Sequence, residues 1–475
     1  MTTIHDNQLD ADIHKAYANV YDTMKWLLPD EIEEAVLTRK SSLDRIMGNP
    51  HAYWAYSRSK IYTHAISPGC SLCGQGEWSC LFVNGICNAQ CFYCPTAQDD
   101  PGQPMANTIE FDDPDDYAEY VSRYYIKGVG FSGGEPLLTF NRLLGYLEAL
   151  KTRLDRPVYT WLYTNGILAN REKLTALCNC GLDEIRFDLS ASGYRLEALE
   201  QALSVIPRIT VEIPAIPEDI STVKQLMIDL ERLGVDHLNL HQIRCTPYNA
   251  NHLIDRGYTF VRGPSVTVLE SELTALALIQ YALERDIALP INYCSFAFRQ
   301  QFQGMGARKR CAKEIKAGHE DITPTGYIRH MQIVGTEKDI NGVCKILTSH
   351  AVGRSLYNIS TKKESLSFAS DLWPLIDFAK VRLKVSYSQA VLRDSVSYFH
   401  PFKKVLMNNE KCLIIEKQTM QSGIWLEGKA VQAFGRLLGI SGKSHTDNTQ
   451  DIRFSKTWDT IISFEAIRPG LARYY

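Results

Sequence analysis

The sequence predicts an α/β protein built on an open barrel of six βα units. Two observations predict it. From residue 80 onward, short β-rich runs alternate with amphipathic stretches of helical period, which is the pattern of repeated βα units around a parallel sheet. Six runs are too few for a closed eight-stranded barrel, so a partial (β/α)6 barrel is expected. The predicted strands are residues 80–84, 128–132, 158–164, 184–190, 209–215 and 237–243.

Each remaining segment has a predicted place around this barrel. Apolar residues at helical spacing predict a helical extension over residues 10–59. A helix at 266–286 and a short strand at 289–294 should close the barrel region. The helices between the strands are predicted at residues 114–125, 140–154, 171–179, 195–205 and 219–233.

The sequence therefore predicts three domains. They are a helical extension at 1–68, the barrel at 69–294, and a substrate or second-cofactor domain at 295–475. The last is predicted to be α+β or mainly β, because residues 382–395 alternate like a strand that residues 411–417 could pair with.

Composition excludes some function classes. The 475 residues carry 51 basic and 54 acidic side chains, so no basic excess favours nucleic acid. A polar N-terminus and the lack of an apolar run of about 18 residues predict a cytoplasmic protein without a membrane span. Thirteen cysteines, six of them within residues 70–94, indicate metal thiolates and not a disulfide framework.

The strongest motif follows the first predicted strand. Cys87, Cys91 and Cys94 have the spacing C-x3-C-x2-C on one short loop. Three thiolates so placed can bind three irons of a [4Fe-4S] cluster and leave the fourth iron open to another ligand.

With this loop and a "GGEP" segment after the second strand, the sequence resembles the radical S-adenosylmethionine (SAM) superfamily. The resemblance implies a TIM-like partial barrel that binds SAM, cleaves it reductively to a 5′-deoxyadenosyl radical, and takes electrons from a donor such as flavodoxin or ferredoxin. It implies that Tyr93 backs the adenine. The "GGEP" residues that would accept the methionyl ammonium are Gly133, Gly134, Glu135 and Pro136. The glycines are expected to let SAM approach the backbone closely.

Later strand ends continue the resemblance. Thr164 and Asn165 end the third strand, and Asp188 and Ser190 end the fourth. The resemblance implies that these side chains hold the carboxylate and ribose of SAM, the alternative being that they only cap loops. Backbone groups from Ile213 onward are expected to border the adenine.

A second group of cysteines precedes the cluster loop. Cys70 and Cys73 form C-x2-C followed by glycine, as in rubredoxin or a zinc knuckle, and Cys80 lies close by. These three predict a mononuclear Fe or Zn site, with Cys178, Cys180 or an unidentified residue as fourth ligand. The alternative is a set of reduced structural thiols.

This knuckle also resembles a subgroup of the superfamily that contains the methyl-coenzyme M reductase arginine C-methyltransferase and the tetraether lipid synthase. The resemblance makes cobalamin a candidate second cofactor. The usual corrin signature D-x-H-x-x-G is absent, but some members of the subgroup bind the corrin without it.

Four further residues are weaker candidates. Cys294 and Cys311 could hold an auxiliary cluster, or both could be buried thiols. Cys245 and Tyr248 follow the sixth strand and could donate a hydrogen atom to a substrate radical, although ordinary loop packing also accounts for them.

The sequence thus predicts a radical SAM enzyme that abstracts hydrogen from an unactivated carbon, with a peptide or protein preferred over a metabolite as substrate. The alternatives are a cobalamin-dependent C-methyltransferase, a glycyl-radical-enzyme activase, and a non-catalytic metal-binding regulatory protein.

Overall fold

The computed structural model describes residues 4–407, 411–440 and 456–474, which fall into two compact units. Unit 1 comprises Met1–Gly304 together with Pro469–Tyr475, and unit 2 comprises Met305–Arg468. The sequence placed the last boundary after residue 294 and kept the C-terminal end in the last domain. The end of the chain instead returns to unit 1, where the backbone N–H of Gly470 donates to the Ser57 carbonyl at 2.8 Å.

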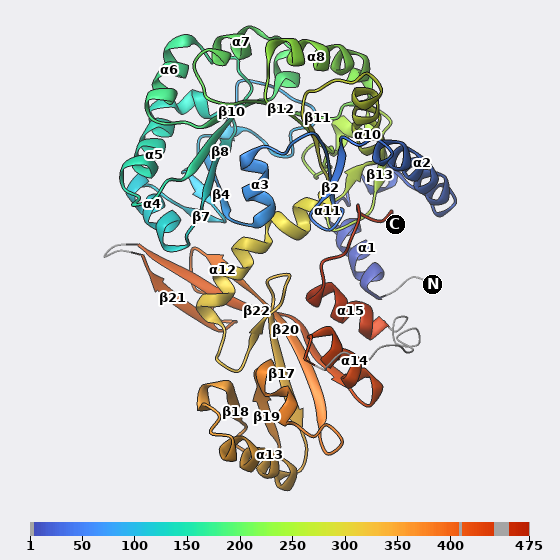
Figure 1. The fold of residues 1–475 in the computed structure, drawn as a ribbon, viewed down its shortest axis with the longest axis vertical. Coiled ribbons are helices and arrows are strands. Elements are labelled where there is room, and N and C mark those ends of the chain that lie inside the picture. Colours follow the sequence, from blue (N-terminus) through green and yellow to red (C-terminus); the bar gives the residue numbers. More distant parts are fainter. Residues whose placement is uncertain (1–3, 408–410, 441–455, 475) are drawn as a thin grey trace. The chain divides into compact units, whose positions relative to one another are not determined.

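Unit 1 is built on seven parallel strands that neighbour one another in chain order (Figure 1). Each pair is parallel, so all seven carboxyl ends lie at one edge. All six predicted strands are present, and the segment expected to close the barrel supplies the seventh. The strands are β4 (Trp78–Ile86), β8 (Gly128–Gly133), β9 (Tyr159–Thr164), β10 (Glu184–Phe187), β11 (Ile209–Pro214), β12 (His237–His241) and β15 (Ile291–Cys294).

Amphipathic helices cover the outer side of these strands (Figure 1). In α8 (Ile220–Leu233), Val223, Met227 and Leu230 recur at helical spacing and are buried, and Gly234 ends the helix in the left-handed conformation at φ 74°. The other covering helices are α4 (Pro114–Arg123), α5 (Phe140–Thr152), α6 (Arg171–Asn179), α7 (Glu197–Leu203) and α10 (Leu269–Glu284).

The N-terminal part is only partly helical. Helices α1 (Ile4–Ala16) and α2 (Pro29–Met47) are followed by a hairpin of β2 (Ala52–Ala55) and β3 (Lys60–Thr63), which pairs antiparallel with β15. The prediction of helix up to residue 59 is therefore wrong at its end. The aromatic-rich segment gains more from cross-strand pairs such as the stacked rings of Tyr53 and Tyr62 than from a helix.

Smaller elements complete unit 1. Helix α3 (Pro68–Gln75) is capped by Ser67, whose side chain accepts from the Cys70 N–H, and it leads into β4. The short strands are β1 (Lys25–Trp26), β5 (Asp99–Asp100), β6 (Met105–Ala106), β7 (Ile109–Glu110), β13 (Thr259–Val261) and β14 (Thr267–Val268).

Unit 2 is an antiparallel sheet with helices, an α+β arrangement. Its strand order is β18-β19-β17-β20-β22-β21, with β16 added on β17. The two strands that the sequence suggested as partners do pair, since Arg393 of β20 lies opposite Ile414 of β22. The strands are β16 (Asp321–Ile322), β17 (Ile328–Val334), β18 (Tyr357–Ile359), β19 (Ser365–Phe368), β20 (Arg382–Arg393), β21 (Phe402–Leu406) and β22 (Cys412–Leu426). The helices are α12 (Met305–Ile315), α13 (Glu337–Ser349), α14 (Lys429–Leu437) and α15 (Lys456–Glu465).

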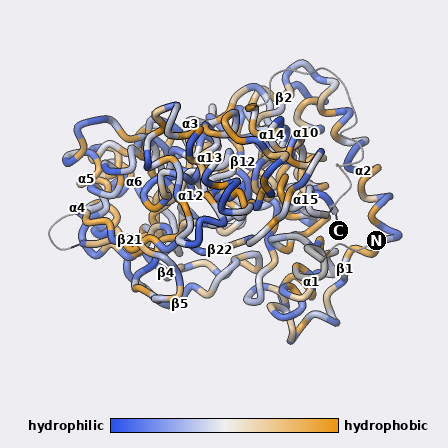
Figure 2. Tube along the Cα trace, turned by 90° about the horizontal axis from the view of Figure 1, so that it is seen from below, coloured by the Kyte–Doolittle hydropathy of each residue, from blue (hydrophilic) through white to orange (hydrophobic). Residues whose placement is uncertain are grey.

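Apolar and polar residues alternate along the chain and do not gather in one long apolar run (Figure 2). Within the described residues, no helix combines the length and the hydropathy that crossing a bilayer would require.

Candidate active site

The three cysteines of the C-x3-C-x2-C motif follow β4, at the carboxyl edge of the sheet. Cys87, Cys91 and Cys94 are free thiols and half-buried. The sulfur of Cys87 accepts from the backbone N–H of Ala89 at 3.4 Å and from the Asn165 amide at 3.6 Å. A set of three reduced thiols on one loop, partly supplied with N–H donors, fits the ligand set of a [4Fe-4S] cluster.

Burial affects these thiols before any metal binds. It raises the pKa of Cys91 to about 11, and it raises the pKa of Cys87 as well. Both are therefore protonated near neutral pH in the metal-free protein. Binding of iron has to release these protons, because only the thiolate is a ligand.

The "GGEP" loop after β8 packs directly on the end of β4. The backbone N–H of Gly134 donates to the Asn84 carbonyl at 2.9 Å, and that of Glu135 donates to the Ile86 carbonyl at 2.7 Å. A Cβ atom on Gly134 would lie 1.9 Å from the Ile86 oxygen, and Gly133 has a φ of 125°. The close approach of two strands therefore already requires these glycines. The sequence had suggested them only for the close approach of SAM.

Glu135 joins this loop to the end of β9. Its side chain is 1% exposed and accepts from three donors: the Leu137 N–H at 2.9 Å, the Thr164 hydroxyl at 2.9 Å and the Asn165 N–H at 2.8 Å. Burial raises the pKa of Glu135, and these hydrogen bonds oppose the rise. Because Asn165 also reaches Cys87, the ends of β4, β8 and β9 form one connected group. Pro136 follows as the first residue of the next turn and is buried.

Tyr93, Asp188 and Ser190 form a second connected group. The Tyr93 hydroxyl donates to Asp188 at 3.0 Å and lies 2.6 Å from the Ser190 hydroxyl, which in turn donates to the other oxygen of Asp188 at 2.5 Å. Burial raises the pKa of Asp188, and it raises that of Tyr93 too, with the Asp188 charge adding to the effect. The sequence singled these residues out separately, and the fold brings them together beside the cluster loop.

The loop after β12 also forms hydrogen bonds with the cluster loop. The sequence did not predict this contact. The Thr246 hydroxyl donates to the Pro95 carbonyl at 2.8 Å, and the Asn249 amide donates to the Tyr93 carbonyl at 3.0 Å. The "TPYN" segment has turn composition, but nothing local identifies its partner.

Comparison with known proteins identifies one domain. Residues 81–230 match the radical SAM superfamily, so this part of the chain is a radical SAM domain. Relatives of the chain include a putative glycyl-radical enzyme activating enzyme of Methanocaldococcus jannaschii, 29% identical over 297 residues, which are 60% of this chain and 78% of the relative.

Solved structures that resemble part of this chain include two with bound SAM. One is anSMEcpe with bound AdoMet and the Cp18Cys peptide, at a TM-score of 0.28 and 14% identity, over 33% of this chain and 48% of that one. The other is SuiB of Streptococcus suis bound to S-adenosylmethionine, at a TM-score of 0.34 and 14% identity, over 48% and 55%. The chain thus spans about half the length of these structures.

The inside of the radical SAM barrel carries buried charges that the sequence reading did not single out. Arg186 of β10 forms ion pairs of 2.8 Å with Glu184 and with Glu212 of β11. Burial opposes ionisation of Glu212, but contacts with His241 and Arg186 outweigh it and hold the pKa of this carboxyl well below its usual range. These residues alternate with apolar ones along their strands, as in "HLNLH" of β12, and this alternation is the signal that could have found them.

The network continues from Glu212 toward the end of β15. The His241 Nε2 atom lies 2.6 Å from Glu212, and Arg299 donates to its Nδ1. Burial and the Arg299 charge lower the pKa of His241. Because Nδ1 accepts from Arg299, Nε2 is the nitrogen that carries the proton and faces Glu212. Arg299 also donates to the Cys294 sulfur at 3.5 Å. We call Glu184, Arg186, Glu212, His241 and Arg299 the interior polar network.

Cys70 and Cys73 on α3 are buried at this interior, and Cys80 on β4 is partly buried. The Cys70 sulfur accepts from Arg186 at 3.6 Å and from Asn239 at 3.4 Å. Burial raises the pKa of Cys80 to about 12 and that of Cys73 as well. No three thiols among the described residues have all sulfurs within 4.8 Å of one another, so a mononuclear site is not preformed.

The predicted partners of these cysteines lie elsewhere. Cys178 belongs to α6 in the outer helical layer, and Cys180 caps the end of that helix. The structure does not bring either to Cys70. Cys294 is a neighbour of Cys73, whose pKa it raises, while Cys311 belongs to unit 2. The mononuclear and auxiliary metal sites therefore remain predictions.

The two candidate hydrogen donors have opposite environments. Cys245 is 1% exposed and packs in an apolar cluster with residues of α1, and Tyr17 donates to its carbonyl at 2.9 Å. Tyr248 is 54% exposed. Cys245 is thus enclosed by the protein and Tyr248 is open to solvent, and both remain predictions as hydrogen donors.

The backbone segment expected to border the adenine begins within β11. Ile213 is fully buried there, opposite Leu240 of β12.

Proposed function

We propose that this chain cleaves SAM reductively and uses the resulting 5′-deoxyadenosyl radical to abstract hydrogen from an unactivated carbon of a peptide or protein. When bound, a [4Fe-4S] cluster supplies one electron to the sulfonium of SAM, which yields methionine and the radical. The radical takes one hydrogen atom from a C–H bond, so the products are 5′-deoxyadenosine and a substrate radical.

One observation carries the proposal. The cluster loop, the "GGEP" loop and the end of β9 are tied into one group through Asn165, which donates to Cys87 and whose backbone donates to Glu135. A SAM molecule chelating the open iron would lie against this group, next to Tyr93 and Asp188. We call Cys87, Tyr93, Glu135, Asn165 and Asp188 the strand-end site.

A pocket supports the placement of SAM at this edge. A cavity of about 220 Å³ lies between the ends of β9 and β10 and is lined by Asn165, Gly166, Phe187, Leu189 and Ser192, among others. Its lining also includes Arg195, Glu197 and Gln201, so polar groups that could bind the polar parts of a ligand make up about half of it.

Activation of a glycyl-radical enzyme is a more specific alternative, in which the substrate is also a protein. The relative from M. jannaschii is named a putative glycyl-radical enzyme activating enzyme, and it is 29% identical over 78% of its length. Under this alternative the abstracted hydrogen would come from a glycine Cα of a partner protein. Electron paramagnetic resonance of the partner after reaction would show a stable glycyl radical in that case only.

Cobalamin-dependent methylation is the other catalytic alternative, and it rests on the sequence resemblance alone. Protein purified from cells supplied with cobalamin would carry a coloured corrin if this alternative holds. A corrin-free protein that still cleaves SAM would exclude it.

The experiment that tests the proposal is anaerobic incubation of the iron-loaded protein with SAM and dithionite. We expect 5′-deoxyadenosine and methionine in equal amounts, and no product from the triple variant Cys87→Ala, Cys91→Ala, Cys94→Ala. Cys412→Ala is the matched control, because Cys412 is exposed in unit 2. The triple variant should also lose four irons and four sulfides per chain. A folded, cluster-containing wild type that forms no 5′-deoxyadenosine would contradict the proposal and favour the non-catalytic alternative.

A further inference from the structure

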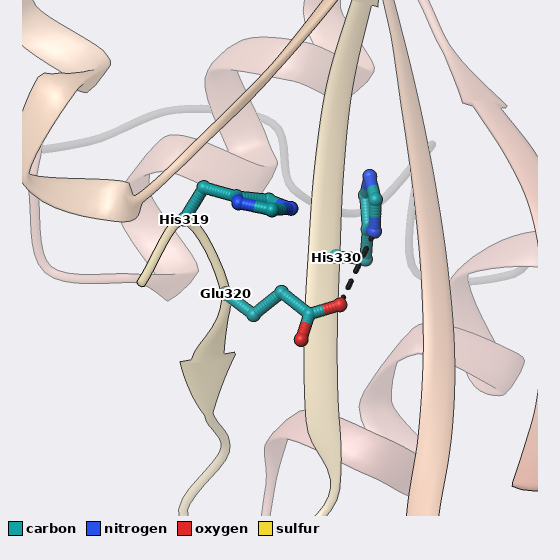
Figure 3. A group of neighbouring side chains, drawn as sticks. All are labelled: His319, Glu320 and His330. Carbon is teal, nitrogen blue, oxygen red and sulfur yellow. Dashed lines mark ion pairs between the residues drawn. The ribbon is translucent and has the colours of Figure 1, made fainter. Parts of the chain in front are cut away.

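Unit 2 contains a second group of metal-ligating side chains, outside the radical SAM barrel. His319 and Glu320 lie on the turn before β16, and His330 lies on β17, which pairs with β16. One ligand atom from each falls within 4.8 Å of the other two. Figure 3 shows both imidazole rings and the carboxylate directed at a common space.

The spacing of the nearest pair matches metal coordination. The His330 Nδ1 atom lies 3.3 Å from the Glu320 carboxylate. Two ligands of a tetrahedral zinc ion, each bound at about 2.0–2.1 Å, are about 3.3 Å apart. The pair could therefore bind such an ion without changing its own separation, while the ring of His319 would complete a His2Glu set.

The surroundings fix the orientation that a ligand needs. The His330 Nε2 atom lies 2.8 Å from the Ser367 hydroxyl, so Nδ1 is the atom left to face Glu320. The backbone N–H of Ala317 donates to Glu320 Oε2 at 2.9 Å, which leaves Oε1 facing the imidazoles. Hydrogen bonds on the far atom of each ligand are the usual support of a metal site.

A lysine occupies part of this space. The Lys417 ammonium of β22 pairs with Glu320 Oε1, the same atom that faces His330. Glu320 is 2% exposed, so its charge needs a cation, and Lys417 supplies one. The Lys417 side chain is 19% exposed, which leaves it a path to solvent when another cation takes its place.

We propose that His319, Glu320 and His330 bind one divalent transition-metal ion, for which Zn²⁺ is the probe, and that the ion displaces the Lys417 ammonium from Glu320. Imidazole and carboxylate ligands suit zinc, and three protein ligands leave one position for water or a donor atom of a bound molecule. The simpler alternative is a permanent ion pair of Glu320 and Lys417 flanked by two histidines. The proposal does not depend on the radical chemistry of unit 1.

The test is zinc binding to the full-length protein with its iron–sulfur cluster in place. Competition with a chromophoric chelator gives the affinity, and X-ray absorption at the zinc edge gives the ligands. We expect one zinc with only nitrogen and oxygen neighbours. Sulfur at about 2.3 Å would place the ion at cysteines instead and overturn the proposal.

Variants separate the ion site from the ion pair. His330→Gln, His319→Gln and Glu320→Gln should each weaken zinc binding by more than about 100-fold, and Ser367→Ala by about 10–100-fold. Lys417→Met should tighten binding by at least about tenfold, because it removes a competing cation. His350→Gln is the matched control, since His350 is an exposed histidine of the same unit at the end of α13.

Two readouts keep the test decisive. Formation of 5′-deoxyadenosine and the circular dichroism spectrum should be unchanged in every variant, which shows that the chain is folded. If Lys417→Met does not fold, Lys417→Gln replaces it. Binding that persists in His330→Gln, or that weakens when Lys417 is replaced, would overturn the proposal in favour of the permanent ion pair.

Discussion

The strand-end site and the interior polar network belong to the same parallel strands but are built in different ways. The strand-end site uses backbone atoms and short-range hydrogen bonds, as where Glu135 accepts from Leu137, Thr164 and Asn165. The interior polar network uses full charges, as where Arg186 lies between two carboxylates at 2.8 Å. The first arrangement determines geometry, while the second mainly has to neutralise buried charge.

The difference has an energetic consequence. A change that displaces the backbone of the strand-end site should abolish chemistry, because the "GGEP" loop is in direct contact with the end of β4 that leads into the cluster loop. A change in the interior polar network should cost stability first, because an unpaired buried charge is more expensive than a lost neutral hydrogen bond.

Gly134→Ala should have the largest effect on activity. The added methyl would meet the Ile86 carbonyl, whose oxygen lies 1.9 Å and whose carbon lies 2.4 Å from the position of the Cβ, so the loop has to separate from β4. We expect loss of detectable 5′-deoxyadenosine formation and a cost in the free energy of unfolding of about 3 kcal/mol or more. Gly342→Ala in α13 is the control: its Cβ meets no atom within 4 Å, and it should stabilise the protein by about 0.5–1 kcal/mol. Normal activity of Gly134→Ala would show that the two loops need not touch.

Arg186→Met tests the interior polar network. It leaves Glu184 and Glu212 without their shared cation, and we expect the free energy of unfolding to fall by about 3–5 kcal/mol. Adding Glu184→Gln and Glu212→Gln to the same chain should recover much of the loss. The protein that remains folded should still cleave SAM, because no hydrogen bond of the strand-end site involves Arg186.

An exposed ion pair serves as the control for the buried charge of Arg186. Arg153→Met removes the 3.0 Å contact with Asp115, in which the two side chains are 64% and 54% exposed, and should cost at most about 1 kcal/mol. Equal losses for Arg186→Met and Arg153→Met, measured by urea unfolding, would refute the role assigned to burial.

His237 gives the same interior a pH dependence. It begins β12, is 7% exposed, and burial lowers its pKa to about 4. In the unfolded chain His237 takes up a proton near pH 6.5, whereas in the folded protein it stays neutral down to about pH 4. The contribution of His237 to the free energy of unfolding is therefore fully present above pH 6.5 and is lost as the pH falls toward 4. At full extent the loss is about 3 kcal/mol, from a shift of 6.5 to about 4.

The measurement is urea unfolding of the wild type and His237→Gln at pH 7, 5.5 and 4.5. The free energy of the variant should depend less on pH over this range, and contributions from other groups cancel in the difference. Parallel curves for the two proteins would mean that His237 is not kept neutral by the fold.

The sequence alone could bring the strand-end residues together for a physical reason. Cys87, Glu135 and Asn165 each follow a strand, and parallel strands bring their carboxyl ends to one edge, so position in the sequence is enough to place them together. What the sequence could not supply was the contact between them. The bonds from Thr164 and Asn165 to Glu135 depend on the register of neighbouring strands.

The interior polar network was not predicted, because its members come from distant parts of the chain. Lys60 is not a member of the network, but its charge acts on His241, and it shows the same difficulty. It is fully buried and its ammonium lies 4.0 Å from the ring centre of Phe298, yet it enters the barrel only because the β2–β3 hairpin pairs with β15. That pairing replaces a predicted helix. His319 and His330 likewise meet only through the β16–β17 hairpin, which no motif in the sequence identified.

Tyr93→Phe should have the smallest effect and is the most specific test of the comparison. It removes a neutral hydroxyl that binds Asp188 and Ser190 at 3.0 and 2.6 Å, while Ser190 continues to donate to the same carboxylate. We therefore expect a cost in unfolding free energy of only about 1–2 kcal/mol, well below that of Arg186→Met. If Asp188 helps to hold SAM, the affinity for SAM measured by equilibrium dialysis should fall as well. Tyr125→Phe, which alters a tyrosine that is 76% exposed, should change neither quantity. Unchanged SAM affinity in Tyr93→Phe would indicate that this hydroxyl only closes the loop, and SAM would then have to be held by the Glu135 side of the site.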